Sequence, residues 1–173
     1  MIDENDIKSR MLELQAYLNY PFNDLKKLSY AMRAINISVP GEGDNHKEYA
    51  NDALATVGDA VLKAVLADYF YNDLKIEFKG EITTRKSYLE NNETMYKLML
   101  NEGLTKYIYN DLYFYDNQRA RSNERPSFKK DHVQYIEAIV GAVYYDSDYY
   151  ETRKWIIKEL LPLLEKYKTI PEN

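Results

Sequence analysis

Helical spacing of apolar residues recurs along most of the chain. Four segments repeat apolar positions three and four residues apart: residues 7–19, a stretch from about residue 23, residues 83–100 and residues 149–167. In the last of them Pro162 predicts a kink, because proline cannot donate the helical hydrogen bond. Residues 38–45 and 116–130 gather proline and polar side chains, so we expect loops there. The pattern therefore predicts a mainly helical protein.

The segment 46–66 is predicted to be a buried helix that carries acids. Its apolar residues cover a face too wide for a surface helix. Asp52, Ala55 and Asp59 share one stripe, because residues three, four and seven apart lie on the same helix face. An ionised carboxylate in a core needs a partner or a metal, and Gly58 inside a helix indicates a second backbone packed close by.

A second apolar helix, predicted over residues 133–146, supplies both partners. Glu137 is the one acid within its apolar run, and small residues that include Gly141 give it a smooth face. We expect the two helices to cross closely and to bring Asp59 and Glu137 together. Such a carboxylate pair suits a hard divalent cation such as Mg²⁺. The alternative is that each acid is structural and satisfied by a basic side chain or a helix N-terminus.

Four motifs of the chain occur together, in the same order, in one known family. Residues 51–62 read Asn-Asp-Ala-Leu-Ala-Thr-Val-Gly-Asp-Ala-Val-Leu, and residues 134–146 read Gln-Tyr-Ile-Glu-Ala-Ile-Val-Gly-Ala-Val-Tyr-Tyr-Asp. Before them stands Leu18-Asn-Tyr-Pro-Phe-Asn-Asp-Leu, and between them lie Lys79-Gly-Glu-Ile-Thr and Leu89-Glu-Asn-Asn-Glu. Together these motifs resemble the ribonuclease III domain over roughly residues 14–158.

The resemblance implies an all-α fold, that of the ribonuclease III endonuclease domain, in a homodimer. We expect one domain over residues 1–173, with its core at about 7–167 and no second domain. Residues 106–115 alternate enough to read as a strand, but the family is helical there and no partner strand is evident. We therefore expect a short helix followed by a loop.

The resemblance also implies a site and a reaction. The family cuts double-stranded RNA with Mg²⁺ held by four acids, two on each acidic helix. Carried over by position, Asp59 and Glu137 remain as metal ligands, and Asp52 remains as a further catalytic acid. The other two ligand positions hold Ala55 and Gln134, which offer no carboxylate. The expected cofactor is Mg²⁺, with Mn²⁺ as a substitute, and no organic cofactor is expected.

The net charge of the chain does not indicate RNA binding, but two local clusters of basic residues do. The formal net charge of −5 does not favour a nucleic-acid partner. Two basic clusters nevertheless flank the proposed acidic site and are candidate RNA-binding residues: Arg119, Arg121, Arg125, Lys129 and Lys130, and Lys79, Arg85 and Lys86. A basic rim around an acidic centre suits an enzyme that grips RNA phosphates, although a basic loop can equally be a solvated loop.

Three functions are therefore open. The first is a metal-dependent endoribonuclease acting on double-stranded or structured RNA. The second is a catalytically impaired domain that binds structured RNA or an assembly, for which Ala55 and Gln134 argue. The third is a helical interaction module without RNA contact, supported only by the sequence pI of about 5.2.

The compartment expected from the sequence is the cytoplasm. The chain has no cysteine, which excludes disulfides and thiolate metal sites and is compatible with a reducing interior. Its first residues are acidic and do not resemble a signal peptide, and no apolar run is long enough to span a membrane. We expect no membrane partner.

Overall fold

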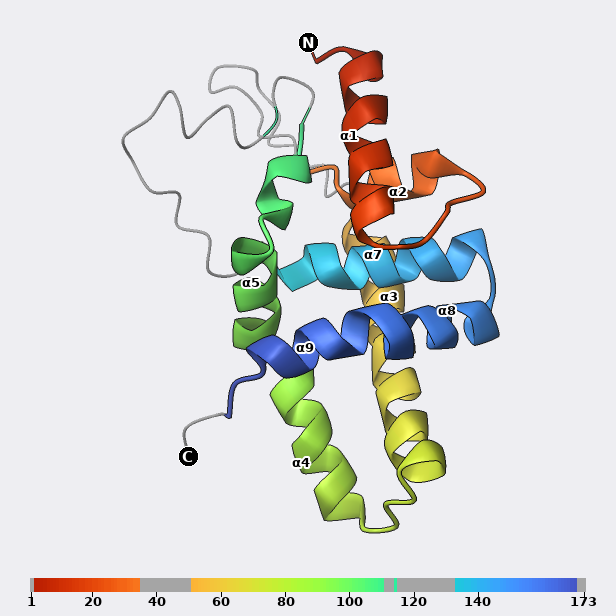
Figure 1. Ribbon diagram of the computed structural model, residues 1–173, viewed down its shortest axis with the longest axis vertical. Helices are drawn as coiled ribbons and strands as arrows, with labels where there is room; N and C mark the ends of the chain where they lie inside the picture. Colours follow the sequence, from red (N-terminus) through yellow and green to blue (C-terminus); the bar gives the residue numbers. More distant parts are fainter. Residues whose placement is uncertain (1, 35–50, 111–113, 115–132, 171–173) are drawn as a thin grey trace, which may run out of the picture.

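The fold is a helical assembly arranged around one central helix. The computed structural model describes residues 2–34, 51–110, 114 and 133–170 (Figure 1). Its helices are α1 (Glu4–Tyr17), α2 (Leu25–Ala31), α3 (Asp52–Asp68), α4 (Lys79–Leu89), α5 (Asn92–Asn101), α7 (Val133–Asp146), α8 (Tyr149–Trp155) and α9 (Leu161–Tyr167). Three short helical turns complete the list: the π-helices η1 (Tyr69–Asp73) and η3 (Ile156–Leu160) and the 3₁₀ helix η2 (Leu104–Tyr107).

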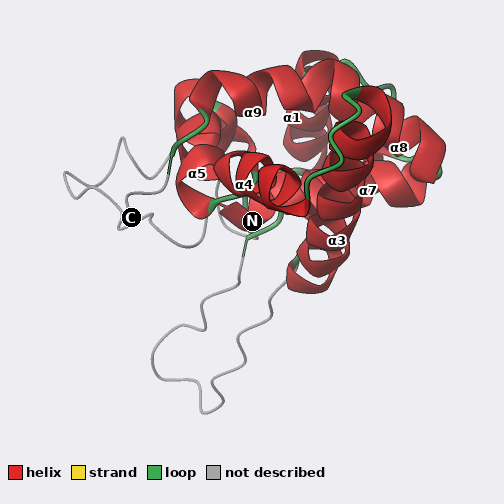
Figure 2. Ribbon diagram, turned by 90° about the horizontal axis from the view of Figure 1, so that it is seen from below, coloured by secondary structure: helices red, strands yellow, loops and turns green. Residues whose placement is uncertain are grey.

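Helix α7 lies at the centre and contacts α2, α3, α5 and α8. In Figure 1 it runs across the middle of the molecule, with α3 passing behind it and the α8–α9 segment below it. Its inner residues Ile136, Ile139, Val140 and Val143 are buried in the main apolar core. The described ranges contain helices and loops but no strand (Figure 2), so the predicted all-α class is confirmed.

Local hydrogen bonds explain where the helices begin. Asp3, Asp24 and Asp148 cap α1, α2 and α8, each accepting a backbone N–H two or three residues later. The predicted single helix over 83–100 is wrong, because Asn91 interrupts it. Its side chain accepts the backbone N–H of Thr94, which ends α4 and starts α5 as a separate helix.

The C-terminal segment is also interrupted, as Pro162 predicted. Pro162 stands in the first turn of α9, where its missing N–H is tolerated, and the π-helix η3 precedes it. Regular α-helical bonding therefore stops between α8 and α9. Residues 106–110 agree with the prediction of a short helix followed by a loop: η2 ends at Tyr107, and among the described residues Tyr109 then forms isolated bridges with Arg33 and Phe114.

A buried carboxylate joins the end of α7 to the start of α2. The Asp146 side chain is fully buried and accepts the backbone N–H groups of Asn23 and Asp24. Lys27 donates to the same carboxylate at 3.2 Å. These bonds satisfy the charge that burial would otherwise penalise and fix the orientation of α7, the helix that carries Glu137.

Candidate functional site

The site is built where α3 and α7 cross with almost no space between their backbones. A Cβ atom on Gly58 would lie 1.7 Å from the Glu137 carbonyl oxygen, and one on Gly141 would lie 2.5 Å from the carbonyl oxygen of Leu54. Glycine is therefore required at both positions by the close approach. The close helix crossing predicted from these glycines is confirmed.

The crossing brings Asp59 and Glu137 together. The side chain of Asp59 is 31% exposed and that of Glu137 is half-buried. Burial first, and then the neighbouring Asp59 carboxylate, raise the pKa of Glu137 from its ordinary 4.5 to about 7, although attraction to Lys63 opposes both. A hydrogen bond from the Glu137 carboxyl to Asp59 contributes to this rise. Near neutral pH Glu137 is therefore partly protonated.

Lys63 is a member of the site that the sequence argument missed. Its Nζ donates to Asp59 Oδ2 at 2.7 Å, one helical turn along α3. The four-residue spacing of Asp59 and Lys63 in the sequence could have identified this pair, since residues four apart on a helix can form ion pairs. Asp59 is thus paired with a basic neighbour, as the structural alternative required, whereas Glu137 is bonded to the other acid.

Glu90, just beyond α4, is a second residue that was missed. Its Oε2 is buried and accepts no hydrogen bond from any residue that the structure describes. Two ammonium groups balance its charge: Lys86, with Nζ 3.8 Å from Oε2, and Lys63, which Glu90 attracts electrostatically. A buried carboxylate oxygen without a donor leaves unsatisfied capacity to accept from a cation or a water.

Ala55 and Gln134, the two positions predicted to be degenerate ligands, take part in packing and in neutral hydrogen bonds. Ala55 is 4% exposed and belongs to a small cluster of buried alanines from α2, α3 and α7. Gln134 donates to Asn51 Oδ1 at 2.7 Å, and the buried Asn51 in turn donates to the Ala31 carbonyl at 2.7 Å. Gln134 therefore links α7 to the beginning of α3 and to the end of α2, and contributes no charge.

Asp52 lies apart from the acid pair. It is partly exposed in the first turn of α3, seven residues before Asp59. At 1.5 Å of rise per residue this places it roughly 10 Å from Asp59 along the helix axis. A carboxylate at that separation cannot bind the same ion directly. Its catalytic role, through a water, stays a prediction.

The described basic residues are mostly engaged with acids. Arg85 donates to Glu81 through Nε and Nη2, at 3.1 and 2.8 Å, and Lys86 pairs with Glu90. Lys79 is exposed at the start of α4 and forms no ion pair with any described residue. The larger predicted cluster lies outside the described residues: Arg119, Arg121, Arg125, Lys129 and Lys130. RNA binding by either cluster stays a prediction.

The donor set at the crossing fits one hard divalent cation. Asp59 and Glu137 supply two carboxylates, and Mg²⁺ is commonly held by one or two carboxylates with waters and substrate phosphates completing its shell. The buried Glu90 Oε2 nearby also lacks a donor within the described ranges. Residues 2–34, 51–110, 114 and 133–170 hold no ready-made group of three acidic or histidine ligands. Among the described residues, the crossing therefore offers the carboxylates of Asp59 and Glu137 to such an ion.

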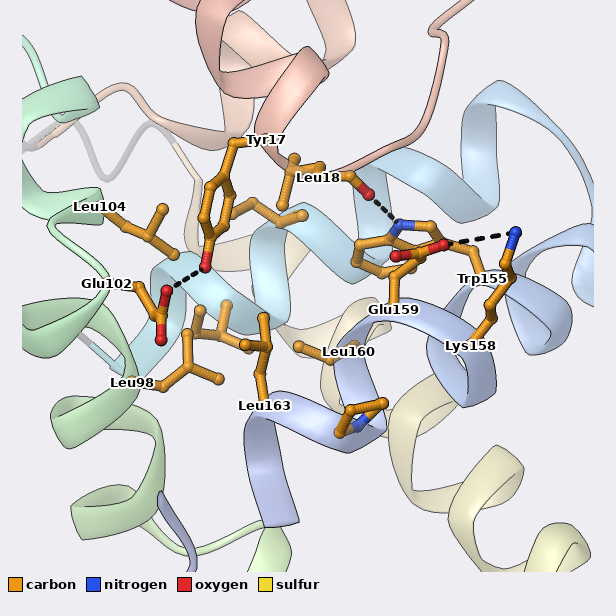
Figure 3. A pocket seen from close by; sticks show the side chains of 13 residues that line it. Tyr17, Leu18, Leu98, Glu102, Leu104, Trp155, Lys158, Glu159, Leu160 and Leu163 are labelled. Atoms are coloured by element: carbon orange, nitrogen blue, oxygen red, sulfur yellow. Dashed lines mark hydrogen bonds and ion pairs between the residues drawn. The ribbon is translucent and has the colours of Figure 1, made fainter. Parts of the chain in front are cut away.

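A cavity of about 330 Å³ lies elsewhere, between α1, α5, α7 and the α8–α9 segment (Figure 3). Its walls are mainly leucine and isoleucine side chains, and its two carboxylates are Glu102 and Glu159. Glu102 accepts hydrogen bonds from Tyr17, Lys166 and Tyr167 at 2.7, 2.8 and 2.6 Å. Those bonds, the one from Lys166 foremost, lower the pKa of Glu102 to about 2. These bonds make the Glu102 carboxylate a link between α1, α5 and α9, so we assign Glu102 a structural role.

The fold and the crossing together define the class: an all-helical domain with paired carboxylates between two glycine-faced helices. A solved structure of the nuclease domain of ribonuclease III from Campylobacter jejuni superposes with a TM-score of 0.64 at 22% identity, covering 90% of this chain and 96% of that one. A second structure of the same nuclease domain superposes with a TM-score of 0.62. This likeness shows the fold.

Sequence comparison shows the family. The profile described as "Ribonuclease III domain" matches residues 52–148, more than half of the chain. Proteins named Ribonuclease 3 from Dehalococcoides mccartyi and Fusobacterium nucleatum are 28% and 29% identical over 164 and 150 residues. The chain belongs to the ribonuclease III domain family. The alignments cover 94% and 87% of this chain but only 65% and 61% of those relatives.

Among the described helices, none combines the length and the apolar character that a bilayer span requires.

Proposed function

We propose that this domain is a metal-dependent endoribonuclease that hydrolyses phosphodiester bonds of double-stranded or structured RNA. The observation that carries the proposal is the meeting of Asp59 and Glu137 at the α3–α7 crossing, with the pKa of Glu137 raised to about 7. Displaced pKa values cluster at functional sites because the same burial and charge that shift them serve chemistry. Membership of the ribonuclease III domain family and relatives named Ribonuclease 3 support the reaction class.

Asp59 and Glu137 are proposed to hold one Mg²⁺ or Mn²⁺ ion. The bound ion supplies a water of lowered pKa and neutralises charge that builds on the phosphate during hydrolysis. The raised pKa of Glu137, about 7, lowers the repulsion between the two carboxylates when no cation is bound. The backbones packed at Gly58 and Gly141 keep both acids in place, because neither helix can slide without a clash.

RNA recognition is proposed to use duplex shape and phosphate charge. Lys79 is exposed at the start of α4 and is free of ion pairs to described residues, which suits a phosphate contact. The cluster from Arg119 to Lys130 is proposed to make further contacts. A-form duplexes are read mainly through phosphates and 2′-hydroxyl groups, so we expect little sequence preference.

A homodimer is proposed as the acting form. The outer side of α3 carries the exposed small residues Ala53, Ala60 and Ala64, with Val57 and Val61 only partly covered. A low-charge helix face of this kind suits a second copy. Two copies would present two acid pairs to the two strands of one duplex.

The test is cleavage of a long duplex RNA by purified protein in Mg²⁺ or Mn²⁺. Wild type should nick the duplex, and Glu137→Gln should lower the rate about 100-fold or more, beyond the loss usual for an outer-shell partner. Glu93→Gln is the matched control, since it removes an exposed carboxylate of a surface pair with Lys97. This control should cut like wild type. Equal background rates for wild type and Glu137→Gln would refute catalysis and favour the impaired RNA-binding domain.

Charge reversal in the basic cluster separates the remaining functions. Replacing Arg119, Arg121 and Arg125 with glutamate should weaken duplex RNA binding in a gel-shift titration and flatten its salt dependence. Unchanged RNA binding would exclude this cluster as the contact surface, and the absence of any binding by wild type would leave the interaction-module function.

A further inference from the structure

Lys63 places a permanent positive charge on the proposed metal ligand. Its Nζ donates to Asp59 Oδ2 at 2.7 Å, so it already occupies one of the acceptor positions that a cation would use. The Lys63 and Asp59 side chains are 45% and 31% exposed. The pair is therefore accessible to ions, and a partly exposed pair of this kind is weak enough to open.

The charge on Lys63 interacts with other carboxylates besides that of Asp59. The hydrogen bond to Asp59 is the main reason why the pKa of Lys63 is raised, and attraction to Asp59, Glu90 and Glu137 adds to it. Lys63 thus remains protonated at neutral pH. The Glu90 Oε2, which accepts no hydrogen bond from a described residue, is also attracted to the Lys63 ammonium group. Lys63 therefore interacts with three acids, from α3, α7 and the end of α4, and shares the charge of Glu90 with Lys86.

Comparison with an ordinary helix pair shows why Lys63 is different. Lys97 and Glu93 on α5 have the same four-residue spacing and a 2.8 Å contact, but Glu93 is 64% exposed. Asp59 instead lies at the close crossing beside Glu137. A divalent ion bound there must share the Asp59 carboxylate with Lys63 or displace it from Oδ2, and until it does so it lies beside a unit positive charge, which repels it.

We propose that Lys63 is a resident counter-cation that competes with the divalent ion for Asp59 and thereby weakens metal binding by this domain. The inference rests on the proposed function, because it assumes that Asp59 and Glu137 form the metal site. Lys63 is a positioning residue: it holds Asp59 and balances the acids until the ion displaces it. The domain accordingly needs a higher divalent-ion concentration than the acid pair alone would require.

The test is a Mn²⁺ titration of the purified full chain at low ionic strength, with free Mn²⁺ followed by electron paramagnetic resonance. Lys63→Met should bind Mn²⁺ on the order of tenfold more tightly than wild type, the effect expected for a unit charge near a divalent ion in a water-like dielectric. Lys63→Arg keeps the charge and should match wild type. Lys97→Met, which removes the lysine of the surface pair, should also match wild type.

Two further measurements distinguish failure of the inference from failure of the site: the salt dependence of Mn²⁺ binding, and Mn²⁺ binding by Glu137→Gln. The advantage of Lys63→Met should shrink as salt rises, because exposed charges are screened. If Glu137→Gln loses Mn²⁺ binding but Lys63→Met binds as wild type or more weakly, the competition is refuted and the metal site stands. If Glu137→Gln binds Mn²⁺ as well as wild type, the proposed site fails and the inference falls with it.

Discussion

Glu137 illustrates at the scale of one residue how packing prepares a site. Its backbone is pressed against Gly58, and its half-buried carboxyl faces Asp59. Burial and the neighbouring charge raise the pKa of Glu137 to about 7, whereas a solvated glutamate titrates near 4.5. The fold therefore favours the neutral carboxyl of Glu137, whereas water favours the carboxylate at the same pH. This difference lowers the stability of the folded state when Glu137 ionises.

The raised pKa predicts a pH-dependent change in stability. Because the folded-state pKa of Glu137 exceeds the unfolded value of about 4.5, its contribution to stability is complete below pH 4.5 and is lost as pH rises through about 7. Glu137→Gln keeps the neutral form. Without divalent ions it should be about 1 kcal/mol more stable than wild type at pH 8.5, after discounting for partial exposure, and equal at pH 4.5.

Urea unfolding at the two pH values, in EDTA, measures this difference in the free energy of unfolding. Glu93→Gln shows what the loss of a surface carboxylate does by itself. A Glu137→Gln variant that is no more stable than wild type at pH 8.5 would show that Glu137 carries no burial penalty.

The sequence was sufficient to find Asp59 and Glu137 because a lone acid in an apolar helical run is conspicuous. It could not show what Ala55 and Gln134, the two predicted degenerate ligand positions, contact in the fold. The hydrogen bonds from Gln134 to Asn51 and from Asn51 to Ala31 join three helices, and no spacing rule identifies such a link. Glu90 was missed for the same reason, since its place beside the site depends on how α4 packs.

At the scale of elements, the crossing of α3 and α7 is the feature on which the site depends. Two glycines allow the backbones to meet, and a buried alanine cluster that includes Ala55 extends the contact toward α2. Dispersion and burial at such a tight crossing stabilise the helix pair, but the fit leaves no room for an added methyl group.

Gly58→Ala should therefore destabilise the protein by about 3 kcal/mol or more, because its Cβ would overlap the Glu137 carbonyl and force the helices apart. Gly80→Ala is the matched control, since a Cβ at Gly80 in α4 meets nothing within 4 Å. That control should be neutral or up to about 1 kcal/mol more stable, because alanine favours helix. Thermal or urea unfolding measures both, and equal stability of the two variants would refute the close crossing.

Helix identity could be predicted well from the sequence, but helix boundaries could not. Apolar spacing continued through Asn91, so residues 83–100 read as one helix, although a side-chain cap divides them. The capping signal was present in the sequence but competed with an unbroken pattern. The π-helices η1 and η3 leave no distinct trace in apolar spacing, so only Pro162 marked the interruption near η3.

At the scale of the whole molecule, the fold and the family were predictable because several motifs agreed in order over most of the chain. The oligomeric state of the protein does not follow from the fold of one chain. The outer face of α3 is low in charge and partly apolar, which we interpret as a surface for a second copy.

Sedimentation equilibrium at micromolar concentration should accordingly give twice the chain mass of 20.5 kDa. Ala60→Glu, on the exposed side of α3, should shift the protein toward the monomer because it places a charge in the proposed interface. A wild type that remains monomeric at 100 μM (an order-of-magnitude ceiling for a stable interface) would contradict the homodimer.

The most direct measurement of the central claim is anomalous diffraction from crystals of the full chain soaked in Mn²⁺. The account predicts one peak between Asp59 and Glu137, within bonding distance of a carboxylate oxygen from each, with Lys63 displaced from Asp59. Crystals without a peak at the crossing, in which Lys63 still donates to Asp59 and Glu137 touches only that acid, would contradict it.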